Sequence, residues 1–407
     1  MAFPALENKN FRIYIGGQSI SLIGTFMQQL AMSWMIYRLT QSPKWLGIAG
    51  FTAQIPTLIF GLFSGVIVDH FNRHRLLMLT QCLAALQALV LAALTLTGTV
   101  ALWHLLVLEF FLGTVNAFEL TARQAFVVQM VEKKRDLPNA IMINSSVIQL
   151  SRLLGPAIGG SLIAIIGEGM CFLINGISYI SVFLALYFMK VKEYIPPAFS
   201  RKQFLREMNV GFKTIYSNSN NRSIIIFLLI ISLFGMPYAS FFPALAEKAS
   251  HPGAQALGWI SSCVGVGSLL SALYLSTKKG APTLAKLASL AAFVFAIALI
   301  SISFLNSFAI ILFFVFLTGS TLVLQLASCN IMIQSTIDDD KRGRVMSIFN
   351  ISLLGVAPLG SLLMGYVAEH LSLEKAMMIN AVFCLLGAVY FLSKSDKVNE
   401  YVLSKTS

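Results

Sequence analysis

Charged residues are scarce in this chain. Only 11% of its 407 residues are Asp, Glu, Lys or Arg, and 57% are hydrophobic. An average soluble domain carries roughly a quarter of its residues as charges, so this chain has too few polar groups to cover a soluble surface. The composition therefore excludes a soluble globular protein and a disordered chain, and it predicts a polytopic membrane protein.

Patterns for metal, disulfide and phosphate binding are not found either. The five cysteines show no CxxC spacing and lie within apolar runs, where we expect buried side chains rather than disulfides or zinc ligands. The five histidines form no HExxH pattern, and there is no GxxxxGKS/T loop to hold ATP. We therefore expect no metal, no cofactor and no concentrated set of catalytic groups.

Twelve apolar runs are long enough to cross the hydrocarbon core as helices, which takes about 20 residues. They cover residues 11–37, 45–68, 76–98, 100–122, 138–166, 170–190, 223–246, 256–277, 282–305, 307–336, 344–368 and 374–393. The short alternating segments of a transmembrane barrel do not occur. We predict an all-α membrane protein with twelve transmembrane helices in two six-helix bundles.

The basic residues give the predicted helices an orientation. With a cytoplasmic N-terminus, the cytoplasmic segments hold 24 of the 29 Lys and Arg residues, the outside loops hold four, and one lies within a span. Basic residues concentrate on the cytoplasmic side of membrane proteins. Both termini are therefore expected in the cytoplasm, and the net charge of +12 requires no nucleic acid partner.

The longest polar gap lies six predicted helices from each end. We expect an N-terminal bundle over 1–190, a linker over 191–222, a C-terminal bundle over 223–393 and a tail over 394–407. Apolar residues at helical spacing in the linker predict an amphipathic helix on the membrane surface, with a solvated linker as the alternative. These residues are Phe204, Met208, Phe212 and Ile215. Two halves around a linker are typical of secondary transporters.

A loop motif joins the second and third predicted spans. Its residues are Gly61, Gly65, Asp69, Arg73 and Arg75. The glycines allow close helix packing, the carboxylate can accept hydrogen bonds from a helix N-terminus, and the basic residues suit the lipid interface. The spacing resembles the loop signature of the major facilitator superfamily, with a plain cytoplasmic loop as the alternative.

A second motif lies in the fifth predicted span. Its residues are Gly155, Pro156, Gly159 and Gly160. They resemble the GPxxGG motif that exporters of this superfamily, mainly antiporters, carry in their fifth helix. Gly155 and Gly159 allow a close helix contact, and Pro156 permits a bend. The motif is expected to form a hinge or a tight contact between the halves, with simple packing as the alternative.

Further segments narrow the resemblance. TARQAF at 121–126, LPNA at 137–140 and RGRV at 342–345 are similar to the branch that contains the enterobactin exporter and macrolide efflux proteins. The resemblance covers essentially the whole chain and implies a bacterial inner membrane and export driven by the proton gradient. One departure lies in the fourth span, where the superfamily often has an arginine four residues before a glycine. Glu109 stands in that place before Gly113, which argues against an arginine-based proton relay.

Few charges lie within the predicted spans. Glu109 and Glu119 are in the fourth span, and Arg152 is deep in the fifth. A charge in hydrocarbon is costly, so each is a candidate for function. Glu109 is the leading candidate for proton coupling, with a structural ion pair or a substrate contact as alternatives. Arg152 is expected to face Glu109, Glu119 or a water-filled cavity, although Glu119 and Arg123 could pair with each other at i,i+4 spacing.

Polar residues follow one helical face in several spans. The cavity candidates are Gln18, Ser21, Thr25 and Gln28 in the first span, Asn116 in the fourth, Tyr238 in the seventh, and Thr321, Gln325 and Ser328 in the tenth. Polar faces turn away from lipid, and the resemblance places helices one, four, seven and ten around a central cavity. The alternative is that these polar residues serve only to pack the helices together. An aromatic-rich cavity with few fixed charges favours an amphipathic substrate over a small ion.

These features together predict a secondary active exporter. The expected cargo is a small amphipathic organic compound, such as a siderophore or a drug, exchanged for protons by alternating access. A lysophospholipid or other lipid transporter is the alternative within transport. A membrane receptor or enzyme is the alternative from another class, and a receptor would bind ligand without proton-dependent flux. We expect a monomer in the lipid bilayer.

Overall fold

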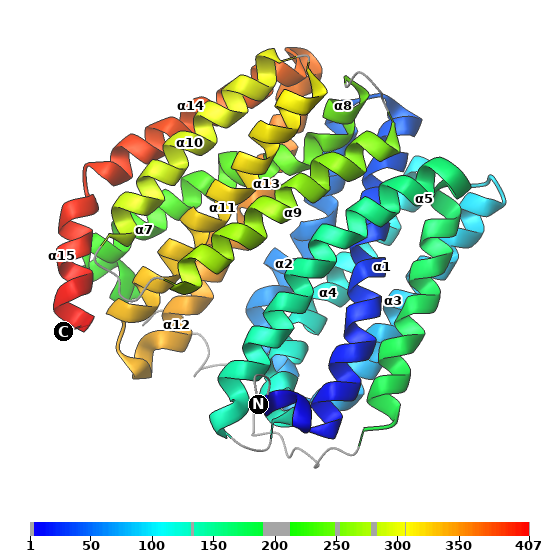
Figure 1. The fold of residues 1–407 in the computed structure, drawn as a ribbon, viewed down its shortest axis with the longest axis horizontal. Helices are drawn as coiled ribbons and strands as arrows, with labels where there is room; N and C mark the ends of the chain where they lie inside the picture. The colour runs from blue at the N-terminus through cyan, green and yellow to red at the C-terminus, as the bar shows by residue number, and fades with distance from the viewer. Residues whose placement is uncertain are drawn as a thin grey trace. The chain divides into compact units, whose positions relative to one another are not determined.

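The computed structural model describes residues 4–131, 134–189, 212–248, 253–277, 283–305 and 307–406. The side chains of 62–67, 69, 134, 339, 340 and 406 lie outside this description. Helices account for almost all of the described chain (Figure 1). Within the described residues, nine helical segments are long and apolar enough to cross a bilayer. The predicted all-α membrane fold is therefore confirmed.

The helices of the N-terminal part follow the predicted spans. They are the 3-10 turns η1 (Pro4–Glu7) and η2 (Lys134–Asp136) and the helices α1 (Lys9–Thr40), α2 (Pro43–His70), α3 (Arg73–Leu96), α4 (Leu102–Met130) and α5 (Leu137–Tyr187). α5 contains both the fifth and the sixth predicted spans, and it bends between them at Gly167, which has a φ of 79°. Glycine adopts this conformation without a steric penalty, so the two spans remain distinct.

The C-terminal part is more interrupted. Its elements are α7 (Ser219–Ile230), η3 (Ile231–Gly235), η4 (Met236–Phe241), α8 (Phe242–Glu247), α9 (Ala254–Thr277), α10 (Leu284–Phe304), α11 (Phe308–Thr336), α12 (Asp339–Asn350), η5 (Ile351–Gly355), α13 (Ala357–His370), α14 (Leu373–Leu392) and α15 (Ser395–Thr406). η3 and η5 are π-helical turns within the seventh and eleventh predicted spans. Hydropathy alone could not predict these interruptions, because apolar residues continue through both turns.

The described helices fall into two compact units. One contains residues 1–40, 55–199 and 252–262, and the other contains 41–54, 200–251 and 263–407. The first turns of α2 therefore pack with the C-terminal helices, and the first turns of α9 pack with the N-terminal helices. Most of the predicted linker, residues 190–211, lies outside the described residues. The segment 212–217 is helical, with Ile215 buried and Phe212 exposed.

Backbone proximity fixes the packing of α1 on α5. A Cβ atom added to Gly17 would lie 2.7 Å from the carbonyl oxygen of Ser181. One added to Gly24 would lie 2.6 Å from the hydroxyl of Ser178. Small residues at such positions let membrane helices approach closely, where dispersion forces are strongest.

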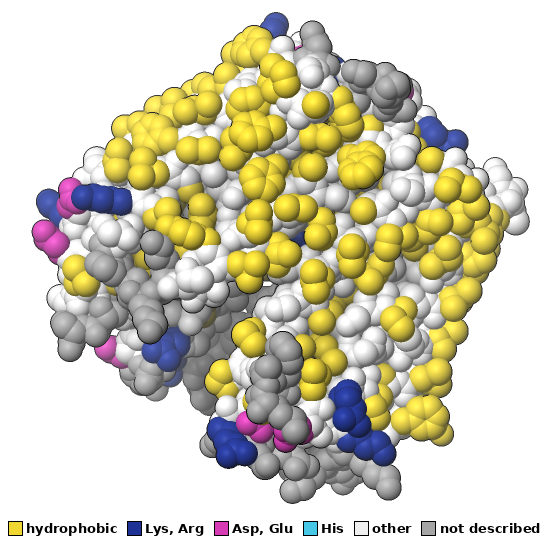
Figure 2. Space-filling view, viewed as in Figure 1, with side chains coloured by type: hydrophobic (Ala, Val, Ile, Leu, Met, Phe, Trp, Pro, Cys, Tyr) yellow, Lys and Arg dark blue, Asp and Glu magenta, His cyan; other side chains and the backbone are white. Residues whose placement is uncertain are grey.

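Outward-facing side chains are apolar along whole helices. On α10, Leu290, Val294 and Ile297 recur at helical spacing and are all exposed. Hydrophobic side chains cover the visible faces of α9 and α10, whereas most of the visible Lys and Arg side chains lie near helix ends (Figure 2). An apolar stripe of this length on a single chain suits contact with lipid rather than with water.

Candidate proton-coupling and gating sites

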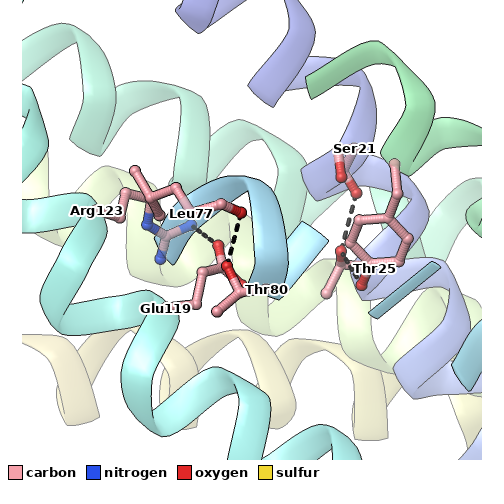
Figure 3. Close-up of polar contacts among 7 residues, drawn as sticks. Ser21, Thr25, Leu77, Thr80, Glu119 and Arg123 are labelled. Carbon is pink, nitrogen blue, oxygen red and sulfur yellow. Dashed lines mark hydrogen bonds and ion pairs between the residues drawn. The ribbon is translucent and has the colours of Figure 1, made fainter. Parts of the chain in front are cut away.

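A charged pair lies within α4. The Arg123 Nη1 is 3.7 Å from the Glu119 Oε1, and each side chain is only 13% exposed (Figure 3). The i,i+4 spacing places both residues on one helical face. The sequence left open whether Glu119 pairs with Arg152 or with Arg123. The structure contains the pair with Arg123.

The Glu119–Arg123 pair lies beside Leu77 and Thr80 of α3, and the Thr80 hydroxyl donates to the Leu77 carbonyl oxygen at 2.9 Å (Figure 3). Tyr14 of α1 and Tyr179 of α5 are also buried in this unit. The Tyr179 hydroxyl lies 3.3 Å from Thr25 Oγ1, which donates to the carbonyl oxygen of Ser21 at 2.9 Å (Figure 3). Low-dielectric surroundings strengthen polar interactions, so burial strengthens the attraction between the two charges.

Glu109 lies further along α4 in a different environment. It is half-buried, and the buried residues Leu105 and Leu112 lie one helical turn before and after it on α4. Its carboxyl forms no hydrogen bond or ion pair with any residue in the described part of the chain. The helix around it is strongly apolar. An ionised carboxylate is costly there, whereas a protonated one is not.

Arg152 lies on α5 with its side chain exposed in the isolated chain. Its guanidinium carbon is 5.7 Å from the centre of the Phe26 ring of α1. A guanidinium over an aromatic face gains cation–π stabilisation. The expectation that Arg152 faces a carboxylate or a cavity stays a prediction, and the cation–π contact was not predicted.

The polar stripe of α1 is buried inside its own unit. Gln28 donates to the Gln87 Oε1 of α3 at 2.8 Å and accepts from the Asn175 Nδ2 of α5 at 2.8 Å. This buried network joins three helices. It favours the packing alternative for Gln28. Gln18 and Ser21 are buried as well, so only Thr25 of this stripe is partly exposed.

The polar stripe of α11 is also buried. Gln325 donates to the Thr321 carbonyl oxygen at 3.1 Å. Within the described chain, the Gln325 Oε1 and the Ser328 Oγ have no hydrogen-bond partner. Tyr238 is buried too, with its ring 5.4 Å from that of Phe295 in α10. Asn116 on α4 is half-buried. Their proposed role as cavity residues stays a prediction.

The loop motif between α2 and α3 is only partly described. Gly65 and the side chain of Asp69 lie outside this description. Gly61 has open space where a Cβ would lie, apart from Thr57 at 3.8 Å. The N-terminus of α3 is capped by Asn72, whose Oδ1 accepts from the backbone N–H of His74 and of Arg75. Asn72 has the usual residue type for an N-cap. The expectation that Asp69 accepts from a neighbouring helix N-terminus stays a prediction. Arg73 begins α3, next to this cap.

The motif in α5 makes two close helix contacts. Gly155 and Gly159 face α1, where added Cβ atoms would lie 2.6 Å from Phe26 Cβ and 2.9 Å from Met27 Cγ. Gly160 faces the first turns of α9, where a Cβ would lie 2.6 Å from the Ala254 carbonyl oxygen. Pro156 lies within the helix and is buried. All three glycines therefore lie in close helix contacts, and the role of the motif as a hinge or as a contact between the halves stays a prediction.

An ion pair at the bend of α5 was not predicted. The Arg38 Nε is 2.9 Å from the Glu168 Oε1, and its Nη2 donates to the Oε2 at 3.3 Å. This two-point contact joins the C-terminal end of α1 to the bend at Gly167. The sequence signal was the acidic residue placed directly after a glycine between two apolar runs. The described residues contain no cluster of three His, Cys, Asp or Glu side chains suited to a metal ion.

Comparison with known proteins then decides the family. The family described as transmembrane secretion effectors matches residues 1–402. The chain belongs to this family. It is a multi-pass membrane transporter of the major facilitator superfamily rather than an enzyme, and the predicted resemblance to exporters of that superfamily is confirmed.

Individual relatives agree with this family. The staphyloferrin A transporter of Staphylococcus aureus is 26% identical over 395 residues, covering 95% of this chain and 97% of its own. The multidrug efflux pump Tap of Mycolicibacterium fortuitum is 24% identical and covers 88% of this chain and 90% of its own. A bacterial homologue of the human lysosomal transporter Spinster, in an inward-facing and occupied conformation, has a TM-score of 0.70 at 13% identity, covering 95% of this chain and 96% of its own. That last likeness shows the shared fold.

Proposed function

We propose that this secretion effector exports a small amphipathic organic compound in exchange for protons. The observation that carries the proposal is Glu109, a half-buried carboxyl in an apolar helix with no partner among the described residues. Such a group can be neutral in one conformation and ionised in another when its access to water changes. Glu119, Arg123 and Arg152 are proposed to set the surrounding field rather than to carry the proton.

The cargo is proposed from the relatives. A transporter named for the siderophore staphyloferrin A and a multidrug efflux pump both match most of this chain. The few charged residues in its spans support an amphipathic organic cargo rather than a small ion. We place the chain in a bacterial cytoplasmic membrane, as a monomer with both termini in the cytoplasm. Residues 1–190 and 223–393 are the proposed moving halves.

Transport by purified protein in lipid vesicles tests this proposal. A pH gradient is imposed, and the movement of staphyloferrin A and of a macrolide is followed, with empty vesicles and a protonophore as controls. The proposal predicts movement of at least one compound that stops when the gradient is collapsed. Binding without gradient-dependent movement would instead indicate a receptor. Comparison of compounds released by cells with and without the chain extends the search to other cargoes.

A further inference from the structure

Two segments of the C-terminal unit share a sequence and a rare geometry. η3 reads ISLFG and η5 reads ISLLG, and both are π-helical turns. A π-turn closes with i→i+5 hydrogen bonds, one residue more than an α-helical turn, and such turns are frequent at functional sites. A proline follows each turn: Pro237 of η4 lies two residues after η3, and Pro358 of α13 lies three residues after η5. The two helices therefore carry the same interruption.

The two π-turns are bonded to each other. The hydroxyl of Ser232 in η3 donates to the carbonyl oxygen of Leu353 in η5 at 2.6 Å, and Ser232 is completely buried. Pro358 lies five residues after Leu353, at the spacing of a π-turn bond, but proline has no N–H to donate. The hydroxyl of Ser232 therefore supplies the donor that the Leu353 carbonyl does not receive from residue 358.

A glycine completes the contact between the turns. Gly360 of α13 lies against η3, where an added Cβ atom would overlap the carbonyl oxygen of Leu233 and lie 2.7 Å from Pro237 Cγ. In an α-helix the Leu233 carbonyl would accept from residue 237, which is again a proline. The Leu233 carbonyl oxygen thus lies against Gly360 of α13, and the Leu353 carbonyl oxygen accepts from Ser232 of η3.

The segments that follow the π-turns hold the start of α2. Gly47 lies against α13, where a Cβ would be 2.5 Å from the Ser361 carbonyl oxygen and 2.7 Å from Gly365 Cα. Ser42 donates to the Glu369 Oε2 at 2.7 Å. η4 joins the same contact, because a Cβ on Gly50 would lie 2.9 Å from Ser240 Oγ.

We propose that η3 and η5 form one paired hinge in the C-terminal unit. The segments after it, η4 with α8 and α13, move together with the first turns of α2, while α7 and α12 stay with the rest of the unit. An interrupted helix bends more easily than a continuous one, and the Ser232–Leu353 bond makes the two interruptions bend together.

Hydrogen–deuterium exchange of the full chain in lipid nanodiscs tests whether the turns move together. Ser232→Ala is expected to speed exchange of the amides at 231–238 and also at 351–358, by about three- to tenfold, the range that one hydrogen bond gives. Ser352→Ala is the matched control, since Ser352 occupies the same place in η5 and makes no bond across the two turns in the described chain. Faster exchange in one turn alone, or the same effect from both variants, would overturn the hinge.

A disulfide tests the link to α2 independently. In a chain without its native cysteines, Ser42→Cys with Glu369→Cys can be oxidised to tie α2 to α13. Slower exchange in both π-turns that is restored by reduction supports the hinge. Unchanged exchange on oxidation means that the turns do not move with α2, and the proposal fails. Neither experiment requires a transported compound, so a failure here is distinct from a failure of the exporter proposal.

Discussion

Glu119 and Arg123 stabilise each other inside a transmembrane helix. Each has little contact with solvent, and their shortest distance is 3.7 Å. Removal of one partner leaves the other charge buried without compensation, which costs about 3–5 kcal/mol for a fully buried pair. Removal of both charges together should therefore cost less stability than removal of one charge alone.

The first prediction concerns this pair. Arg123→Gln is expected to lower the free energy of unfolding by about 3 kcal/mol, because Glu119 loses its counter-charge. The double variant with Glu119→Gln should recover most of that loss. Unfolding in mixed micelles, followed by tryptophan fluorescence, measures both. Equal destabilisation by the single and double variants would mean that the two charges do not interact.

The second prediction concerns the buried amide network of α1. Gln28→Leu should lower the free energy of unfolding by about 1–3 kcal/mol, since the amides of Gln87 and Asn175 lose a partner. Gln18→Leu is the control. Gln18 is equally buried, but its Oε1 has no partner in the described chain. That variant should be neutral or stabilising. The same unfolding assay distinguishes the two, and equal losses would contradict the account.

Sequence reasoning identified these polar residues but not their partners. The spacing of Gln18, Ser21, Thr25 and Gln28 defined a face, because a helix repeats every 3.6 residues. Which helix meets that face depends on how α1 packs against α3 and α5. A polar face can meet water or another polar face, and hydropathy does not distinguish these cases.

At the scale of helices, single glycines set how closely two elements approach. Gly16 and Gly17 of α1 are neighbours with opposite surroundings. A Cβ on Gly17 would press on the backbone of Ser181, whereas a Cβ on Gly16 would meet nothing within 4 Å.

The third prediction uses this contrast. Gly17→Ala should lower the free energy of unfolding by about 1–3 kcal/mol, because α1 must move away from α5. Gly16→Ala should be neutral or stabilise by up to about 1 kcal/mol, because alanine is the better helix former. Thermal unfolding of the two purified variants makes the comparison. A larger loss for Gly16→Ala would contradict the described packing of α1 on α5.

Most helix positions could be predicted from the sequence, since runs of apolar residues long enough to cross a bilayer are a strong signal. The ends of the helices were predicted less accurately. α4 continues to Met130, beyond the predicted end at 122, because helical hydrogen bonding continues where the side chains become polar. η3 and η5 were not predicted, although the repeated ISLxG sequence was visible, because it has no effect on the apolar pattern.

At the scale of the whole molecule, charge distribution predicts orientation. The fourth prediction is that green fluorescent protein fused after Ser407 fluoresces, whereas alkaline phosphatase at the same place is inactive, because the distribution of basic residues predicts a cytoplasmic C-terminus. An insertion of each reporter after Gln41, in a short predicted outside loop, is the control and should give the reverse pattern. Active phosphatase after Ser407 would contradict the topology.

Proton coupling through Glu109 is the central claim, and the most direct measurement separates gradient-driven transport from simple exchange. Glu109→Gln is compared with Glu400→Gln, the same change on an exposed residue of α15. In vesicles with a pH gradient, Glu109→Gln should abolish uphill movement of the cargo, yet exchange of labelled for unlabelled cargo without a gradient should continue. Glu400→Gln should retain both activities. Uphill movement that persists in Glu109→Gln at the native rate would contradict the account.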